Sequence, residues 1–252
     1  MWHEEPLAPD FRASDNRSVS DVAKAVAENR SVISVPDFAT EAEVALLTGE
    51  AARAEEAKLE NPLTSSRQRL RFVIQGRTLT IGSVVPALAP SVQLLAEVLV
   101  QRAIVFVQTK LPALATEFGL VGCDARTPLD YSEGEPAINI YYGPGGDFQP
   151  HQDMRALTLL VSLSTSELDY EGGGTSFFAA DAQLGSVRRG RCAPAAILRP
   201  LPGTALLWGG TQLHAGAEVT SGRRVVFVAS FTPVPRPDCQ SRSEPSAPER
   251  PA

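Results

Sequence analysis

The second half of the chain consists of short apolar runs separated by glycine and proline, and this pattern restricts the fold more than any other feature. Runs of this length suit β-strands, since the helices of globular domains need longer stretches. Several short strands at this spacing are typical of a β-sandwich or barrel and not of a sheet made from βαβ units. The predicted strands cover residues 137–142, 155–164, 175–179, 195–201, 204–208 and 224–232.

The first half of the sequence has helical periodicity instead. A predicted strand at residues 32–35 is followed by Thr40 and, three residues later, by Glu43, which is the pattern of a helical capping box. A helix is therefore expected to begin at Thr40. A second helix is expected over residues 91–118, where apolar residues recur at helical spacing, and Pro112 should bend or break it.

The two ends of the chain differ from its middle in composition. Residues 1–28 are polar, with scattered alanines and a short predicted helix at 20–28, and we expect them to form a weakly ordered extension. Residues 233–252 hold six of the 20 prolines and almost no large apolar side chain. Such a composition buries too little surface to offset the entropy lost on ordering. We therefore expect one domain at residues 29–232, followed by a disordered tail.

Composition and charge argue against several classes of partner. The 23 basic and 29 acidic residues give a formal net charge of −6, so no nucleic-acid partner is expected. The longest apolar run, Ala103 to Val107, has five residues, whereas a membrane span needs about 20. The acidic start of the chain lacks the apolar stretch of a secretory signal. Three widely spaced cysteines, Cys123, Cys192 and Cys239, do not form a disulfide framework, and we expect a cytoplasmic or nuclear location.

Two of the three histidines have an informative placement. His151 lies just before the predicted strand 155–164, and His214 lies just after the predicted strand 204–208. Residues two apart on a strand point to the same side, so His151 and Asp153 share a side. Two imidazoles and one carboxylate are the ligand set of non-haem Fe(II) oxygenases. The same set suits a zinc hydrolase, and a single histidine near a strand end is more often an ordinary hydrogen-bonded residue.

Two further residues are candidates for binding a ligand. Arg224 opens an apolar strand ten residues after His214, where a buried guanidinium is costly without an anion. Its planar fork suits a carboxylate. Neighbours on a strand alternate, so only one of Arg223 and Arg224 points inward, and the spacing favours Arg224. Tyr142, nine residues before His151, is either a packing aromatic or a ligand contact.

The order of these residues resembles the 2-oxoglutarate- and Fe(II)-dependent dioxygenases, and within them the catalytic domain of prolyl 4-hydroxylases and lysyl hydroxylases. The resemblance covers about residues 30–232 and is strongest over 137–232. It rests on Tyr142, Pro150-His151-Gln152-Asp153, Thr158, Tyr170 to Phe177 with its three glycines, Pro202-Gly203, and His214-Ala215-Gly216 through Gly222-Arg223-Arg224.

The resemblance implies a fold and a site. The fold would be mainly β (α+β), a double-stranded β-helix of the jelly-roll type flanked by N-terminal helices. His151, Asp153 and His214 would be the metal ligands for Fe(II). Arg224, with Arg223 as the alternative, would bind the distal carboxylate of 2-oxoglutarate. Tyr142, Thr158 and Thr175 would help to line that site.

The resemblance also implies a reaction, in which O₂ and 2-oxoglutarate are consumed, succinate and CO₂ are formed, and a C–H bond is hydroxylated. Ascorbate would keep the iron ferrous, and the carboxylate of Asp153 favours hydroxylation over halogenation. A prolyl residue of a protein or peptide is the first expectation for the substrate, and a lysyl residue, a free amino acid or another small molecule is the next. The basic clusters at Arg67, Arg69 and Arg71 and at Arg188, Arg189 and Arg191 either flank the cavity mouth or form solvated faces.

Two other classes of function remain open from the residues alone. One is the zinc hydrolase, which the lack of an evident additional carboxylate near the histidine motif makes less favourable. The other is a jelly-roll binding module with a vestigial metal site. The sequence does not specify an oligomeric state.

Overall fold

The structure is a computed structural model, and it describes residues 1–7, 17–59, 67–71 and 89–234. The helices are α1 (Val19–Ala27), α2 (Glu41–Leu59), α3 (Pro90–Lys110), α4 (Pro112–Glu117) and α5 (Leu184–Arg188). The strands are β1 (His3–Pro6), β2 (Ser31–Val35), β3 (Arg67–Arg71), β4 (Leu129–Tyr131), β5 (Ala137–Tyr142), β6 (Gly146–His151), β7 (Leu157–Ser162), β8 (Tyr170–Gly172), β9 (Thr175–Phe177), β10 (Ala196–Leu198), β11 (Ala205–Gly209) and β12 (His214–Pro233).

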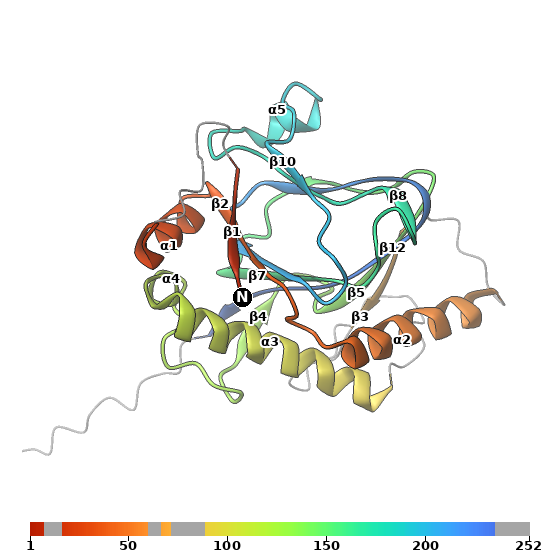
Figure 1. Cartoon of the computed structure of the whole chain (residues 1–252), viewed down its shortest axis with the longest axis horizontal. Coiled ribbons are helices and arrows are strands. Elements are labelled where there is room, and N and C mark those ends of the chain that lie inside the picture. Colours follow the sequence, from red (N-terminus) through yellow and green to blue (C-terminus); the bar gives the residue numbers. More distant parts are fainter. Residues whose placement is uncertain (8–16, 60–66, 72–88, 235–252) are drawn as a thin grey trace, which may run out of the picture.

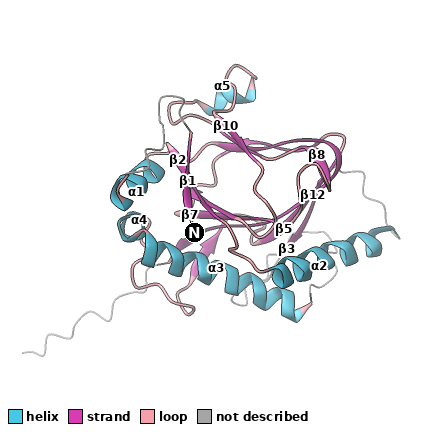
Figure 2. Cartoon of the chain, in the orientation of Figure 1, coloured by secondary structure: helices cyan, strands magenta, loops and turns pink. Residues whose placement is uncertain are grey.

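The long strand β12 joins two sheets that face each other. Its first part pairs with β6, β8 and β9, and β9 pairs in turn with β10. Its second part lies between β5 and β7 in a larger antiparallel sheet of order β1-β2-β11-β7-β12-β5-β3. The curled sheets enclose an interior, and α2 and α3 cover the outside of the larger one (Figures 1 and 2). The predicted jelly-roll fold with flanking helices is confirmed.

Both faces of the large sheet are buried, and side chains alternate between them. Ile138, Ile140 and Phe227 point outward into the core shared with the helices. Tyr141 and Val226, on the same two strands, belong to a separate cluster inside the barrel. Because both faces are apolar, the strands are nearly continuous apolar runs in the sequence, and hydrophobicity alone does not show which face is interior.

The predicted helix signals are confirmed. At the start of α2, the Glu43 backbone N–H donates to Thr40 Oγ1 over 3.2 Å, and the Thr40 N–H donates to the Glu43 carboxylate over 2.8 Å. Pro112 separates α3 from α4, because proline cannot continue the hydrogen-bond ladder of a helix. Gly119, just after α4, has a φ of +65°, a conformation that suits glycine at a helix end.

The amino-terminal segment is more ordered than expected. β1 pairs with β2 over four residues, and Leu7, which follows β1, is only 1% exposed. Helix α1 begins with a capping box at Ser18 and buries Val22 and Val26. A weakly held extension was the wrong expectation for these parts, because Leu7, Val22 and Val26 are buried against the rest of the domain. Of the predicted disordered tail at residues 233–252, Pro233 ends β12, and residues 235–252 lie outside the described residues.

Helix α3 lies at the centre of the helical layer. Judged by length and composition alone, it is the one helix in the described part of the chain that would suit a membrane span. Eight of its side chains, among them Leu99 and Ile104, are buried, as in the core helix of a globular domain. Its apolar composition is therefore accounted for by packing against the large sheet.

Candidate active site

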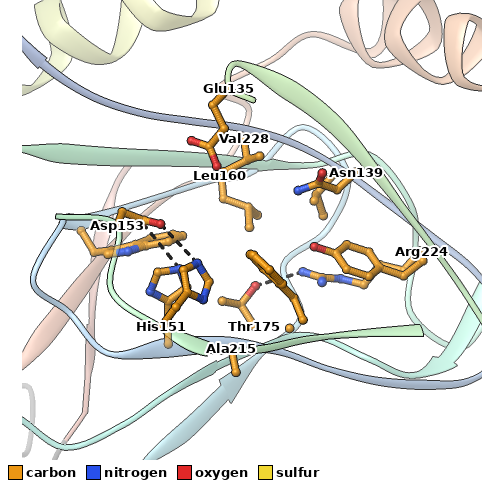
Figure 3. Close-up of a pocket in the computed structure, with 15 residues that line it drawn as sticks. Glu135, Asn139, His151, Asp153, Leu160, Thr175, Ala215, Arg224 and Val228 are labelled. Carbon is orange, nitrogen blue, oxygen red and sulfur yellow. Dashed lines mark hydrogen bonds and ion pairs between the residues drawn. The ribbon is translucent and has the colours of Figure 1, made fainter. Parts of the chain in front are cut away.

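Three side chains that could bind a metal converge at one end of the barrel interior (Figure 3). His151 at the end of β6 is paired in register with His214 at the start of β12, and Asp153 follows on the loop after β6. Asp153 Oδ1 lies 3.3 Å from His151 Nε2, and Oδ2 lies 3.5 Å from His214 Nε2. One ligand atom from each residue lies within 4.8 Å of the other two. This is the one such group of His, Cys, Asp and Glu among the described residues.

Backbone carbonyls orient both imidazoles. His151 Nδ1 lies 2.9 Å from the carbonyl oxygen of Gln149, and His214 Nδ1 lies 2.9 Å from that of Gln212. A carbonyl only accepts hydrogen bonds, so each Nδ1 carries the proton and each Nε2 presents its lone pair to the cluster. Metal-binding histidines are usually held by such a hydrogen bond from the second ring nitrogen.

The carboxylate of Asp153 is held in place and ionised. The Thr158 hydroxyl donates to Asp153 Oδ2 over 2.6 Å. Burial alone raises the pKa of Asp153, but the neighbouring His214, His151 and Thr158 side chains outweigh this and lower the pKa to about 2. Burial lowers the pKa of His214, against the attraction of Asp153. The cluster therefore offers an ionised carboxylate and a neutral imidazole, the states in which these groups bind metals.

A buried guanidinium lies at the other end of the cavity. Arg224 is 3% exposed, donates from Nη2 to Thr175 Oγ1 over 2.9 Å, and lies 5.4 Å from the centre of the Tyr141 ring. Arg223 points to the outside of the sheet, where Nη2 lies 2.6 Å from the Glu55 carboxylate of α2. The structure thus places Arg224 in the cavity, as the spacing favoured, and not Arg223.

Tyr142 does not line the cavity. Its ring packs with the outward-facing core, and its hydroxyl donates to the Glu55 carboxylate on α2. Tyr141 occupies the interior position, directly opposite Arg224 in the strand pairing. The expectation that Tyr142 lines the cavity is therefore wrong, and its neighbour Tyr141 lies there instead. The reason is that Ile138 and Ile140, which share its side of β5, face the helices and not the barrel interior.

The other predicted residues lie at or beside the cavity. His151, Asp153, His214, Arg224 and Thr175 line it. Thr158 lies behind Asp153 and contacts that carboxylate. Sequence reasoning missed further lining residues, among them Glu135, Asn139, Tyr141, Phe148, Leu160 and Trp208.

Two of the missed residues are close to the polar groups of the cavity. The Trp208 ring meets the His214 ring edge to face, with centroids 5.0 Å apart. Glu135 is 5% exposed, and its Oε2 accepts a hydrogen bond from the Ser230 backbone N–H over 2.6 Å. The antiparallel pairing of β5 with β12, which places Tyr141 opposite Arg224, could have identified Tyr141. Nothing in the sequence around Glu135 marks it as a cavity residue.

The backbone passes very close to Arg224 at the second of three successive glycines. Gly173 has a φ of +58°, and a Cβ there would lie 2.8 Å from the Tyr170 ring and 3.3 Å from Arg224 Cδ. Only glycine fits this conformation and this space without displacement of its neighbours. The glycine run therefore does more than form a turn, because it allows the backbone to pass beside the buried guanidinium.

The donor set fits a ferrous ion and an organic dianion. Two Nε2 atoms and one carboxylate on one side of a centre leave the opposite side open toward the cavity, as in facial-triad iron sites. Among the described residues no carboxylate forms an ion pair with Arg224, so its buried charge calls for an anion. A keto acid with a second carboxylate satisfies both ends of the cavity.

Comparison with known proteins agrees with this geometry. Residues 137–231 match the model of the family described as the 2OG-Fe(II) oxygenase superfamily. A segment of 87 residues is 36% identical to the multifunctional procollagen lysine hydroxylase and glycosyltransferase LH3 of Homo sapiens, and 34% identical to that of Rattus norvegicus. The segment is 34% of this chain and 10% of those proteins, so the chain matches only about a tenth of their length.

Solved structures share the fold over nearly the whole chain. The non-heme alpha ketoglutarate dependent carbocyclase SnoK from nogalamycin biosynthesis has a TM-score of 0.53 at 13% identity, covering 95% of this chain and 98% of that one. AviO1 from Streptomyces viridochromogenes Tue57 has a TM-score of 0.50 at 15% identity, covering 94% and 100%. The matched family segment contains the two histidines, the aspartate and the buried arginine of the cavity. Residues 137–231 thus match the 2OG-Fe(II) oxygenase superfamily, and the barrel fold and the His-Asp-His cluster agree with an oxidoreductase of the dioxygenase type.

Proposed function

We propose that this oxygenase hydroxylates a C–H bond of a prolyl residue in a protein or peptide, with succinate and CO₂ as co-products. His151, Asp153 and His214 hold Fe(II), and Arg224 binds the distal carboxylate of 2-oxoglutarate. The observation that carries the proposal is that three inward-pointing ligand atoms share one cavity with a buried guanidinium that forms no ion pair with any described residue. One mole each of 2-oxoglutarate and O₂ is consumed for each C–H bond converted to C–OH.

The residues of the cavity have separable roles in this reaction. Bound Fe(II) supplies the oxygen chemistry that side chains lack. The backbone carbonyls of Gln149 and Gln212 fix the proton of each imidazole on Nδ1. The Thr158 hydroxyl holds the Asp153 carboxylate. Thr175 and Tyr141 orient the guanidinium of Arg224 through a hydrogen bond and a cation–π contact. Apolar side chains such as Phe148, Leu160 and Val226 exclude water from the space between the two ends.

The nature of the hydroxylated residue is the least constrained part of the proposal. The apolar lining between the polar ends suits an uncharged prolyl ring. The 36% identity to a lysine hydroxylase favours a lysyl residue as the second candidate. Paired peptides that differ only in carrying proline or lysine at the target position separate the two, by the mass increase of one oxygen atom in the product.

Loss of the aspartate ligand tests the metal assignment. Asp153→Ala removes one of three ligand atoms, so we expect succinate formation to fall by roughly a hundredfold or more, because metal-bound catalysis requires the complete ligand set. The assay contains Fe(II), 2-oxoglutarate and peptide, with and without ascorbate, which we propose keeps the iron ferrous. Asp147→Ala, on the exposed side of β6, is the matched control. Equal turnover in the two variants would refute the assigned ligand.

Two neighbouring arginines test the site for 2-oxoglutarate. Arg224→Ala removes a bidentate partner of a carboxylate, and we expect 2-oxoglutarate to bind about tenfold to a hundredfold more weakly, with metal affinity nearly unchanged. Arg223→Ala breaks only the ion pair with Glu55 and should leave 2-oxoglutarate affinity as it was. Isothermal titration of the protein with Mn(II) gives the metal affinity, and titration of the Mn(II)-loaded protein with 2-oxoglutarate gives the affinity for 2-oxoglutarate. A larger loss in Arg223→Ala would reverse the assignment.

A further inference from the structure

A strongly basic segment follows β9 and contains α5 and β10. Residues 178–200, here called the basic lobe, contain one aspartate and four arginines, a net charge of +3 in a chain whose formal charge is −6. Figure 1 shows α5 projecting from the end of the barrel opposite the α2–α3 layer. Nothing in the proposed reaction uses these charges.

The basic lobe is anchored beside both candidate metal histidines. Val187 of α5 is buried in a small cluster with Leu213 and Ala215, the two residues that flank His214. The Arg188 Nε donates to the backbone carbonyl of Pro150, the residue before His151, over 3.1 Å. These contacts hold the lobe at the end of the cavity where the metal ligands lie.

The arginines of the basic lobe form no ion pair with an acidic residue that the structure describes, unlike most other described arginines. Seven arginines elsewhere form ion pairs with Asp or Glu, and these are Arg17, Arg30, Arg53, Arg102, Arg126, Arg155 and Arg223. In the part of the chain whose side chains the structure describes, the arginines without such a pair are Arg224 in the cavity and Arg188, Arg189, Arg191 and Arg199 in the lobe.

Neighbouring acids do not neutralise the basic lobe. Its own Asp181 is exposed and forms no ion pair with a described residue. The nearest acid on β6, Asp147, accepts a hydrogen bond from the Gln149 amide instead. Arg188, Arg189 and Arg191 are exposed to solvent, so their guanidinium groups are accessible to a partner. In a chain with an excess of acids, a group of arginines without an ion pair to any described residue forms a local positive field.

We propose that the basic lobe binds an acidic stretch of the peptide substrate and so presents the neighbouring target residue to the metal site. Guanidinium groups bind carboxylates bidentately, and three of them within one short segment suit several Asp or Glu side chains in an extended chain. This inference rests on the proposed function in one respect, which is that the bound peptide is the substrate of the hydroxylation. The docking itself needs neither iron nor turnover.

Direct binding of defined peptides tests the docking. The probe is a fluorescent peptide with a central proline flanked on both sides by glutamates, and its partner carries glutamine in place of every glutamate. Fluorescence anisotropy without metal should show at least about tenfold tighter binding of the glutamate peptide, with an affinity that falls as salt rises from about 50 to about 300 mM. Similar affinity for both peptides would overturn the proposal.

Charge-matched variants localise the binding. The triple variant Arg188→Gln, Arg189→Gln, Arg191→Gln should lose about tenfold or more in affinity for the glutamate peptide. The control triple Lys24→Gln, Lys110→Gln, Arg126→Gln removes the same charge from other surfaces and should bind almost as wild type does. Equal losses in the two triples would contradict the assignment of the basic lobe, because they would show an effect of net charge alone.

A second variant tests whether the loss of affinity comes from the missing charges or from structural damage to the basic lobe. Arg189→Gln with Arg191→Gln leaves the bond from Arg188 to β6 intact and should still lose affinity severalfold. Peptide-independent succinate formation should be unchanged in this double variant, whereas turnover of the glutamate peptide should show a raised KM. Failure of all succinate formation in wild type would refute the proposed function while leaving the metal-free binding result intact.

Discussion

Hydrogen bonds at single residues determine where each ligand atom of the site points. Two backbone carbonyls fix the imidazole protons, and one threonine hydroxyl fixes the carboxylate of Asp153. At the other end of the cavity, Thr175 orients Arg224 in the same way. Each of these partners is neutral, so it orients a charged or metal-binding group without changing the net charge of the cavity.

Thr158→Val tests this orienting role. The substitution keeps the size of the side chain and removes the hydrogen bond to Asp153 Oδ2, so the carboxylate gains freedom to rotate away from the two Nε2 atoms. Loss of such partners typically weakens metal binding by about tenfold to a hundredfold. Mn(II) titration followed by calorimetry measures the effect, with exposed Thr116→Val of α4 as the control. An unchanged Mn(II) affinity would mean that Thr158 does not hold the ligand.

Among the elements, α2 connects the helical layer to the large sheet through paired charges. The Arg102 guanidinium of α3 donates to both carboxylate oxygens of Glu43, over 2.7 and 2.9 Å, and to the carbonyl of Phe38. At the far end of α2, Glu55 binds Arg223 and Tyr142 on the outside of the sheet. These contacts explain why Arg223 and Tyr142 are structural, although both lie next to residues of the cavity.

The pair of Glu43 and Arg102 makes stability depend on acidity in a defined direction. The hydrogen bonds from Arg102 lower the pKa of Glu43 from 4.5 to about 2. Because the pKa of Glu43 is lower in the folded than in the unfolded protein, its ionised carboxylate contributes fully to the free energy of unfolding above the unfolded-state pKa of 4.5. This contribution is lost as the pH falls from 4.5 toward 2. We expect Glu43→Gln to cost about 1 kcal/mol in urea unfolding at pH 6 and less than half of that at pH 3. Exposed Glu41→Gln of the same helix is the control, and a cost that grows on acidification would contradict the assignment.

The elements also show how far the sequence alone could lead. β5, β7 and β11 were predictable because they are buried on both faces and are therefore continuous apolar runs. β6 and the first part of β12 were not, because they contain few buried apolar side chains and their pairing is interrupted by register shifts. The same burial on both faces hid the inward side of β5, which is why Tyr142 was expected where Tyr141 lies.

The site residues also divide into those that the sequence could predict and those that it could not. His151, Asp153, His214 and Arg224 were predictable because few residue types perform their chemistry and each stands beside a recognisable strand. Glu135 was not, because a single glutamate before a proline has no periodic or spacing signal, and only the assembled barrel brings its carboxylate to the cavity. Positions whose role depends on contacts between distant strands are therefore the ones that require the structure.

On the scale of the whole molecule, the candidate metal site joins parts of the chain that are separate before folding. His151 and Asp153 come from β6 and the loop after it, whereas His214 begins the strand that links the two sheets. An ion held by all three binds the folded chain and not the unfolded one. Metal binding should therefore stabilise the entire domain by mass action, independently of any catalytic activity.

Thermal unfolding with Mn(II) measures this coupling. At a concentration about a hundredfold above Kd, a metal that binds only the native state adds about 2.7 kcal/mol, which corresponds to a rise in Tm of about 5–10 °C for a domain of this size. Chelation with EDTA should reverse the rise. Asp153→Ala should abolish most of it, whereas Asp147→Ala on the exposed side of β6 should keep it. A rise of equal size in Asp153→Ala would show that the ion stabilises the protein from another position.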